Sequence, residues 1–375
     1  MLRDVKLIGS YEIAEGDAID ARTARVGLEI APWDGARFVS TLGQQDIAEQ
    51  GKRSFASFGL AQSLPITSRL TVDASLDGNR VLGGFDARKV INPDHPVASG
   101  GYLGEGGILS EDFTAVTLGA SYRAGLWSAT ARAEYRAADS ADRKGFTFGA
   151  IRQLGEGSVI GTGFTYTHAS ADGGAETTVF DGAISAAHRP ADGEFAFLAK
   201  LEYRMDEVID AVADELAPTG RTALNVTGDA LSRRLIGSLS TNWTPAGRDE
   251  GVRVQRSEFG LFLAVRHNFD TYQGFALEGT TLLGGVDIRI GLGDRFEFGG
   301  TATIRANLAD HTRSFAFGPQ IGLVPTRDML LTLGYNFSGF HDRDFSAARN
   351  TDDGVYASMK LKLDTNSLDF LGLGR

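Results

Sequence analysis

The chain has 375 residues and no cysteine, and its 37 Lys and Arg against 48 Asp and Glu give a formal net charge of −11. This acidic balance argues against nucleic-acid binding, and the lack of thiols excludes cysteine catalysis and thiolate metal sites. No apolar run approaches the roughly 18 residues that a membrane-spanning helix needs.

The first residues, MLRDVKLIGSYEIAEG, lack the apolar core and the small-residue cleavage site of a secretory signal. If the protein is exported, we therefore expect this sequence to be a domain or fragment of a longer polypeptide.

Short segments in which apolar and polar residues alternate follow one another along the chain. A period of two puts one kind of side chain on each face of a strand. We predict eighteen strands, at 4–14, 23–32, 36–46, 53–64, 68–77, 112–123, 126–136, 144–153, 157–168, 177–188, 194–204, 232–243, 257–268, 280–292, 295–308, 313–324, 328–339 and 354–364. Residues 206–216 have a helical spacing of apolar residues instead. The pattern predicts an all-β fold that forms a single domain over residues 1–375.

The stretch from Phe113 to Arg136 shows the alternation most clearly. Two strands joined at a tight turn each have an apolar face edged by Trp or Tyr and a face with charges of both signs. Such strands are typical of a wall with lipid outside and a polar lumen inside. We therefore predict a closed antiparallel transmembrane β-barrel. Its lipid-facing residues would include Val116, Leu118, Trp127, Ala131, Val286, Ile288, Ile304, Leu331 and Leu333.

The connections between the predicted strands alternate in length. Short connections are predicted at 32–35, 65–68, 124–125, 154–156, 189–193, 293–294 and 325–327. Longer ones are predicted at 15–22, 47–52, 78–111, 137–143, 169–176, 205–231, 269–279, 309–312 and 340–353, and the connection 244–256 breaks the alternation. Outer-membrane barrels have short periplasmic turns and longer external loops. The longest connection, 78–111, is a candidate loop for constricting or capping the lumen.

Aromatic residues gather toward the two ends of the predicted strands. Trp33, Trp127, Trp243 and Phe296 are expected on the short-turn side, and Tyr135, Tyr166, Tyr203, Tyr335 and Phe337 on the opposite side. Amphipathic rings are favoured at the level of lipid headgroups, so these residues predict two aromatic girdles.

Charged residues occupy the polar faces of the same strands. The predicted lumen-lining residues are Arg25, Glu29, Arg132, Glu134, Arg136, Lys200, Glu202, Arg204, Asp287, Arg289, Glu297, Arg305, Lys360 and Lys362. Unpaired ions in a dry core would cost several kcal/mol each, so this density of charge favours a wet interior. The set could form a selectivity lining or a solvated wall held by mutual ion pairs.

Residues 333–363 carry a pattern that resembles a known family. Gly334-Tyr335-Asn336, Gly339-Phe340, Asp342, Asp344-Phe345 and a last strand with alternating basic residues ending at Asp364 make up the pattern. It resembles the C-terminal β-barrel region of very large, repeat-bearing outer-membrane proteins of Gram-negative bacteria. Residues 23–33 and 278–292 show the same likeness. The chain departs from the usual barrel ending, since Leu363 rather than an aromatic residue ends the apolar face.

No residues group in a way that predicts catalysis, a cofactor or a metal. The nearest groupings are His168 with Ser170, and His341 with Asp342 and Asp344. A catalytic site needs a nucleophile, a base and an orienting group together, so we expect these to be polar strand-end and loop residues.

Four functions compete at this stage. The first is an outer-membrane barrel that embeds and anchors a larger surface protein, and helps to export it. The second is a free-standing porin-like channel for small polar solutes. The third and fourth, an outer-membrane hydrolase and a soluble β-propeller, have less support. The expected partners are outer-membrane lipid and lipopolysaccharide, the barrel-assembly machinery and an N-terminal surface domain of the same polypeptide.

Overall fold

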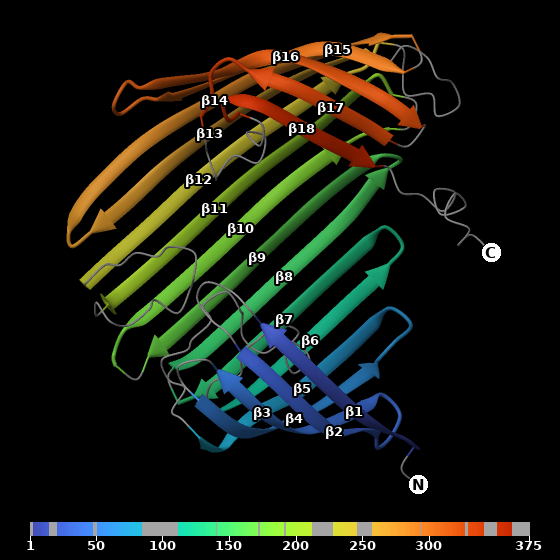
Figure 1. Cartoon of the computed structure of the whole chain (residues 1–375), viewed down its shortest axis with the longest axis vertical. Helices are drawn as coiled ribbons and strands as arrows, with labels where there is room; N and C mark the ends of the chain where they lie inside the picture. Colours follow the sequence, from blue (N-terminus) through green and yellow to red (C-terminus); the bar gives the residue numbers. More distant parts are fainter. Residues whose placement is uncertain are drawn as a thin grey trace.

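A computed structural model shows an all-β chain whose strands form one curled sheet (Figure 1). The structure describes residues 3–14, 21–47, 51–84, 112–139, 141–171, 173–190, 193–211, 228–245, 257–293, 295–326, 329–340 and 351–361. The strands are β1 (Arg3–Ala14), β2 (Ala21–Ala31), β3 (Ala36–Ile47), β4 (Gly51–Pro65), β5 (Leu70–Gly84), β6 (Phe113–Ala124), β7 (Trp127–Ala138), β8 (Ala141–Gly155), β9 (Ser158–Ala171), β10 (Glu176–His188), β11 (Phe195–Ala211), β12 (Gly228–Trp243), β13 (Glu258–Tyr272), β14 (Phe275–Leu292), β15 (Phe296–Asn307), β16 (Arg313–Thr326), β17 (Met329–Asn336) and β18 (Gly354–Leu361).

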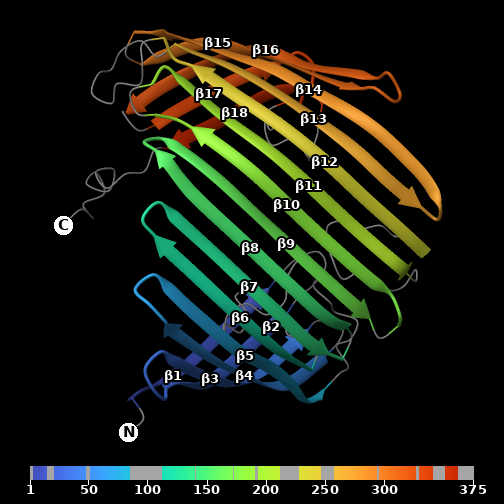
Figure 2. The same cartoon turned by 180° about the vertical axis from the view of Figure 1, so that it is seen from behind.

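Each strand pairs antiparallel with the next along the chain, from β1–β2 to β17–β18. The sheet curves round so that β1–β4 and β14–β18 lie at its two ends, on either side of the long central strands (Figures 1 and 2). The eighteen antiparallel strands predicted from the sequence are confirmed. Within the described residues β1 and β18 are not paired, so closure of the barrel stays a prediction.

The register places residues of one kind on each face of this sheet. On the convex face Leu118 pairs with Ala74 on one side and Ala133 on the other, while its neighbour Thr117 faces the concave side. Leu118 is 57% exposed and Thr117 is 1% exposed. Of the residues expected to face lipid, Val116, Leu118, Trp127, Val286, Ile288, Ile304 and Leu333 are exposed, and Ala131 and Leu331 are half-buried.

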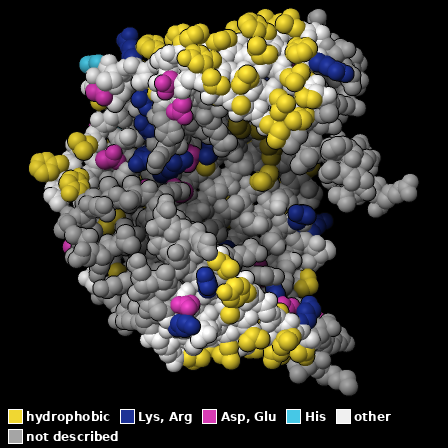
Figure 3. Space-filling view, viewed as in Figure 1, with side chains coloured by type: hydrophobic (Ala, Val, Ile, Leu, Met, Phe, Trp, Pro, Cys, Tyr) yellow, Lys and Arg dark blue, Asp and Glu magenta, His cyan; other side chains and the backbone are white. Residues whose placement is uncertain are grey.

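Hydrophobic side chains also gather on the outer surface near β16–β18, and the molecule is hollowed between that part and β1–β4 (Figure 3). Among the described residues, buried side chains are polar at least as often as apolar, with Gln45, Asn79 and Asn336 among the largest that are fully buried. A compact apolar cluster on the concave wall contains Ile236, Leu283, Ala316 and Phe340. This distribution is the reverse of the one in a water-soluble domain.

The helix suggested by the spacing in 206–216 is wrong over residues 206–211. These residues continue β11, where Asp206 pairs with Ser232 and Val208 with Ala230. Val208 is buried on the concave side, so pairing with β12 outweighs a weak local helical pattern. Residues 212–216 lie outside the described part. No helix in the described part of the chain has the length and apolarity to cross a membrane.

The predicted alternation of connection lengths is only partly correct. The expected long connection 269–279 is a two-residue turn in which Gln273 and Gly274 both have positive φ, 45° and 83°. Positive φ at both central residues matches the twist of a tight hairpin. The expected 137–143 connection likewise shrinks to residues 139–140, between β7 and β8. Polar residues in these stretches belong to strand ends, which explains the error.

Two other connections refine the prediction. Residues 78–84, assigned to the candidate constriction loop, extend β5, and residues 85–111 lie outside the described part. In the β15–β16 connection, Thr312 donates hydrogen bonds to Asp310 from its Oγ1 at 2.7 Å and its N at 2.9 Å. These bonds hold the pKa of the Asp310 carboxyl below its ordinary value.

Candidate functional site

The concave face carries the charged residues that the sequence assigned to a lumen wall. Strand pairing brings them to this face because they share the phase of buried concave residues such as Thr117. The described residues placed there are Arg25, Glu29, Arg132, Glu134, Arg136, Lys200, Glu202, Arg204, Asp287, Arg289, Glu297 and Arg305. Lys360 belongs to β18, but its side chain lies outside the described part, as does all of Lys362.

A first ion-pair group joins β1, β2 and β3. Glu29 lies 2.7 Å from Arg37 Nη2 and 3.5 Å from Lys6 Nζ. Glu29 on the middle strand thus holds a cation from each neighbour. Cross-strand pairs of opposite charge stabilise a sheet by about 0.2–1 kcal/mol each.

A second group spans β5, β6 and β7. Arg132 Nη2 lies 3.7 Å from Asp73 Oδ2, and its Nη1 lies 3.9 Å from Glu134 Oε1. Gly119 on β6 lies between Arg132 and Asp73, and a Cβ there would overlap the Asp73 carboxylate. The glycine therefore lets an ion pair form across an intervening strand.

Further polar groups are buried beside this second group. Ser57 Oγ donates to Asn79 Oδ1 at 2.9 Å, and Ser75 Oγ donates to Asp77 Oδ2 at 3.1 Å. Asn79 is 0% exposed and Asp77 is 2% exposed. Buried polar groups of this kind are tolerated because they are hydrogen-bonded.

A third group lies along β11 alone. Lys200 Nζ lies 2.7 Å from Glu202, and Arg204 also pairs with Glu202. Residues two apart on a strand point to the same face, so this row of alternating charge follows directly from the sequence.

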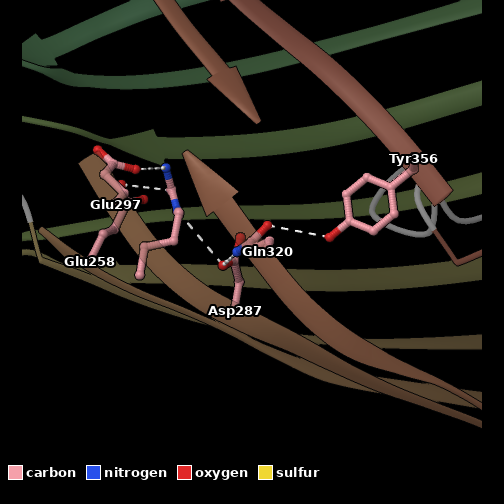
Figure 4. Close-up of polar contacts among 6 residues, drawn as sticks. Glu258, Asp287, Glu297, Gln320 and Tyr356 are labelled. Atoms are coloured by element: carbon pink, nitrogen blue, oxygen red, sulfur yellow. Dashed lines mark hydrogen bonds and ion pairs between the residues drawn. The ribbon is translucent and has the colours of Figure 1, made fainter. Parts of the chain in front are cut away.

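The fourth group is centred on Arg289 of β14 (Figure 4). Its guanidinium lies 2.8 Å from Glu258, 3.7 Å from Asp287 and 3.8 Å from Glu297. Gln320 Nε2 donates to Asp287 Oδ1 at 2.7 Å, and the Tyr356 hydroxyl donates to Gln320 Oε1 at 3.4 Å. These contacts form one connected network of residues from β13, β14, β15, β16 and β18.

Three arginines of the concave face also lie over aromatic rings. The guanidinium carbon lies 4.2 Å from the ring centre for Arg136 over Phe113, and 4.9 Å for Arg305 over Phe340. The corresponding distance is 5.8 Å for Arg25 over Phe55. Cation–π contacts of this kind fix the arginines against the wall.

The aromatic residues predicted to form girdles occupy the convex face and the turns. Trp127 and Phe296 begin strands, Trp243 ends one, and Trp33 lies in a turn at the same edge of the sheet. Trp243 stacks on Phe195 with ring centres 6.2 Å apart. At the other edge, Tyr335 contacts Phe337 at the end of β17, with ring centres 5.4 Å apart.

Two of the predicted girdle residues lie farther from the strand ends than expected. Tyr203 has eight more residues of β11 beyond it, because the strand continues to Ala211. Tyr166 similarly lies within β9, where it pairs with Phe146 and Phe180. Tyr135, whose hydroxyl donates to Asp142 at 3.1 Å, lies three residues from the end of β7.

Several residues of the concave networks were missed by sequence reasoning. Lys6, Arg37, Asp73, Asp77 and Glu258 all take part. The phase of alternation could have found each of them. Their partners on other strands depend on register, which alternation alone does not give.

The contacts described on this face are ion pairs, hydrogen bonds and cation–π contacts. In the described part of the chain, no group of three or more His, Asp or Glu could hold a metal ion. His168, one of the residues considered for catalysis, bonds Thr178 at 3.1 Å rather than Ser170. His341, Asp342 and Asp344 lie outside the described residues.

No protein-family model matches the chain, and no curated protein matches it. A bacterial polysaccharide outer membrane secretin resembles it with a TM-score of 0.32 and 12% identity over 84% of this chain and 95% of that chain. The FrpB iron transporter from Neisseria meningitidis resembles it with a TM-score of 0.42 and 12% identity over 95% of this chain and 67% of that chain. OpdQ from Pseudomonas aeruginosa resembles it with a TM-score of 0.32 and 13% identity over 85% of this chain and 95% of that chain. TM-scores this low do not indicate the function of this chain, so the function is inferred from its own residues.

Proposed function

We propose that this protein is an outer-membrane β-barrel of a Gram-negative bacterium that embeds and anchors a larger surface protein. The convex face is the observation that carries the membrane part of this proposal. It exposes large apolar side chains on strands from β1 to β18, among them Leu7, Leu118 and Met359. A water-soluble protein rarely exposes apolar surface so continuously, whereas a lipid-facing barrel must.

The concave face supports the same orientation. Its ion pairs and buried amides would be costly against hydrocarbon and are compatible with water. The described part of the antiparallel meander contains no helix between strands and leaves both faces of the sheet uncovered, which suits lipid on one side and a lumen on the other. Outer-membrane lipid, lipopolysaccharide and the barrel-assembly machinery are the partners that such a protein requires.

Membrane embedding is tested by expressing the protein behind an export signal and separating the two membranes. We expect it in the outer-membrane fraction, with a gel mobility that changes on heating, as is characteristic of a folded barrel. Recovery of the folded protein in the soluble periplasmic fraction would contradict the proposal.

The anchoring role rests on the resemblance of 333–363 to the barrel region of large surface proteins. It is tested by fusing an epitope-tagged passenger to the N-terminus and adding protease to intact cells. We expect the passenger to be cleaved, because an exported passenger lies outside the cell. A passenger that is cut only after the outer membrane is broken would reject export to the surface while leaving the barrel itself in place.

A porin-like channel is the second candidate, favoured by the charged concave wall. A barrel of about this strand number has room for an aqueous lumen. Deleting residues 85–111, which include most of the predicted capping loop, should then raise single-channel conductance in planar bilayers. No conductance before or after the deletion would favour a plugged anchor.

A further inference from the structure

A cavity of about 230 Å³ opens in the concave wall formed by β12–β18. It lies beside the Arg289 group of Figure 4, which supplies Asp287, Arg289, Gln320 and Tyr356 to its lining. Drug-sized ligands occupy pockets of about 300–1,000 Å³, so this cavity suits a smaller molecule or one unit of a longer one.

Two aromatic rings of the cavity lining lie against glycines of neighbouring strands. A Cβ at Gly285 would overlap the Phe262 ring, and a Cβ at Gly334 would overlap the Tyr356 ring. Phe262 and Tyr356 both line the cavity. Because each ring covers a residue without a side chain, it offers apolar surface to the cavity.

Carboxylates outnumber guanidinium groups in and beside the lining. Asp287 and Arg289 are the charged residues among the lining side chains, and they pair at 3.7 Å. Arg289 is further neutralised by Glu258 and Glu297, and Asp287 accepts a hydrogen bond from Gln320. An anionic ligand would meet three carboxylates around one guanidinium. This surplus of carboxylates disfavours an acidic ligand but not a basic one.

Hydroxyl and amide groups make up most of the remaining lining. They are contributed by four strands and one connection: Ser240, Asn242, Thr301, Thr303, Thr332, Thr351 and Ser358. A hydroxyl both donates and accepts, so a ring of hydroxyls is complementary to a ligand that carries several hydroxyls itself.

We propose that this cavity binds one sugar residue that carries no acidic group. The aromatic surface suits the apolar face of a pyranose ring, and the hydroxyl and amide lining suits its edge. The surplus of carboxylates disfavours acidic ligands of the same size. The site depends on the concave wall alone, so it does not require the anchoring role.

The proposal is tested by saturation-transfer NMR on protein refolded in lauryldimethylamine oxide, a detergent without a sugar headgroup. The probes are glucose and glucuronate at pH 6, which share a ring size and differ in charge. We expect glucose to bind at least fivefold more tightly than glucuronate. No saturable binding of glucose, or equal or tighter binding of glucuronate, would overturn the proposal.

Two variants assign the binding to this cavity. Thr303→Val removes a lining hydroxyl while keeping the side-chain shape, and Tyr356→Phe removes the phenolic hydroxyl while keeping the ring. Each should weaken glucose binding about two- to tenfold, the loss expected for one hydrogen bond. Thr147→Val, a concave threonine of β8 outside the cavity, is the matched control and should bind as the parent does.

Equal losses in all three variants, or no loss in the two cavity variants, would show that the sugar does not occupy this cavity. Heat-dependent gel mobility, measured on the same samples, reports whether the barrel is folded. A folded barrel that binds no sugar would contradict the proposed sugar site and would leave the proposed membrane role unaffected.

Discussion

At the scale of single residues, exposure is inverted relative to a soluble domain. The adjacent residues Thr117 and Leu118 differ in exposed fraction, because the polar one is buried at 1% and the apolar one is exposed at 57%. The alternation in the sequence predicted which residues share a face. It also indicated which face is outward, because charges of both signs crowd the other one.

The apolar face is predicted to tolerate no cation near its middle. Leu333 is 57% exposed in the centre of β17, and its neighbour Thr332 faces the concave side. Leu333→Arg should destabilise the folded barrel in lipid vesicles by about 2–4 kcal/mol, the cost of an arginine near the bilayer midplane. Thr332→Arg is the control and should fold at nearly the parent level. Urea titration followed by gel mobility gives both free energies, and similar losses would mean that the faces are wrongly assigned.

The glycine between Asp73 and Arg132 is predicted to be required for their contact. A side chain at Gly119 would displace the Asp73 carboxylate. Gly119→Ala should therefore cost about 1–3 kcal/mol of unfolding free energy, as overpacking does elsewhere. Gly83→Ala, where a Cβ has nothing within 4 Å, should cost less than the Gly119 variant. Chemical denaturation of both variants measures the difference, and equal costs would contradict the crossing ion pair.

At the scale of elements, the strands were largely predictable and their connections were not. Alternation marks strand interiors, so all eighteen strands were located from the sequence. It does not mark where a strand ends. Gln273-Gly274 turns tightly inside what looked like a polar loop, and 206–211 is strand despite helical spacing. The ion pairs needed the register as well, which is why Asp73 was not matched to Arg132.

The last hairpin is predicted to be essential for assembly. β18 (Gly354–Leu361) pairs along the whole of β17, from Met329↔Leu361 to Asn336↔Gly354. Truncation after Asn350 would leave the β17 edge unpaired, and unsatisfied backbone groups in lipid cost several kcal/mol each. The truncated chain should fail to insert, whereas removal of residues 367–375 should not matter. A truncated chain that still shows heat-dependent mobility would contradict this prediction.

At the scale of the whole molecule, the open question is how the curled sheet closes. Its two edge strands, β1 and β18, must pair if the barrel is to span a membrane, because an unpaired edge is not tolerated in lipid. Antiparallel pairing would align residues of the same face. In both strands even-numbered residues are concave, as the pairs Lys6↔Glu29 and Thr332↔Ser358 indicate.

Closure is predicted to allow a disulfide between the edge strands. The chain has no cysteine, so no native thiol can cross-link with an engineered pair. Ser10→Cys combined with Tyr356→Cys or with Ser358→Cys should give a cross-linked band in at least one case, since paired residues lie within disulfide reach. Gly9→Cys with Ser358→Cys places the thiols on opposite faces and should not cross-link. Cross-linking of this control alone would contradict the expected pairing.

The most direct test of the membrane account is spin-label accessibility on single-cysteine variants in lipid vesicles. Labels at Leu118, Val286 and Leu333, which are exposed on the convex face, are compared with labels at Ser128, Thr130 and Thr147 on the concave face. Molecular oxygen concentrates in lipid, and a neutral nickel chelate concentrates in water. The account predicts that oxygen relaxes the three convex labels more strongly and the nickel chelate relaxes the three concave labels more strongly. Equal collision rates on the two faces would contradict it.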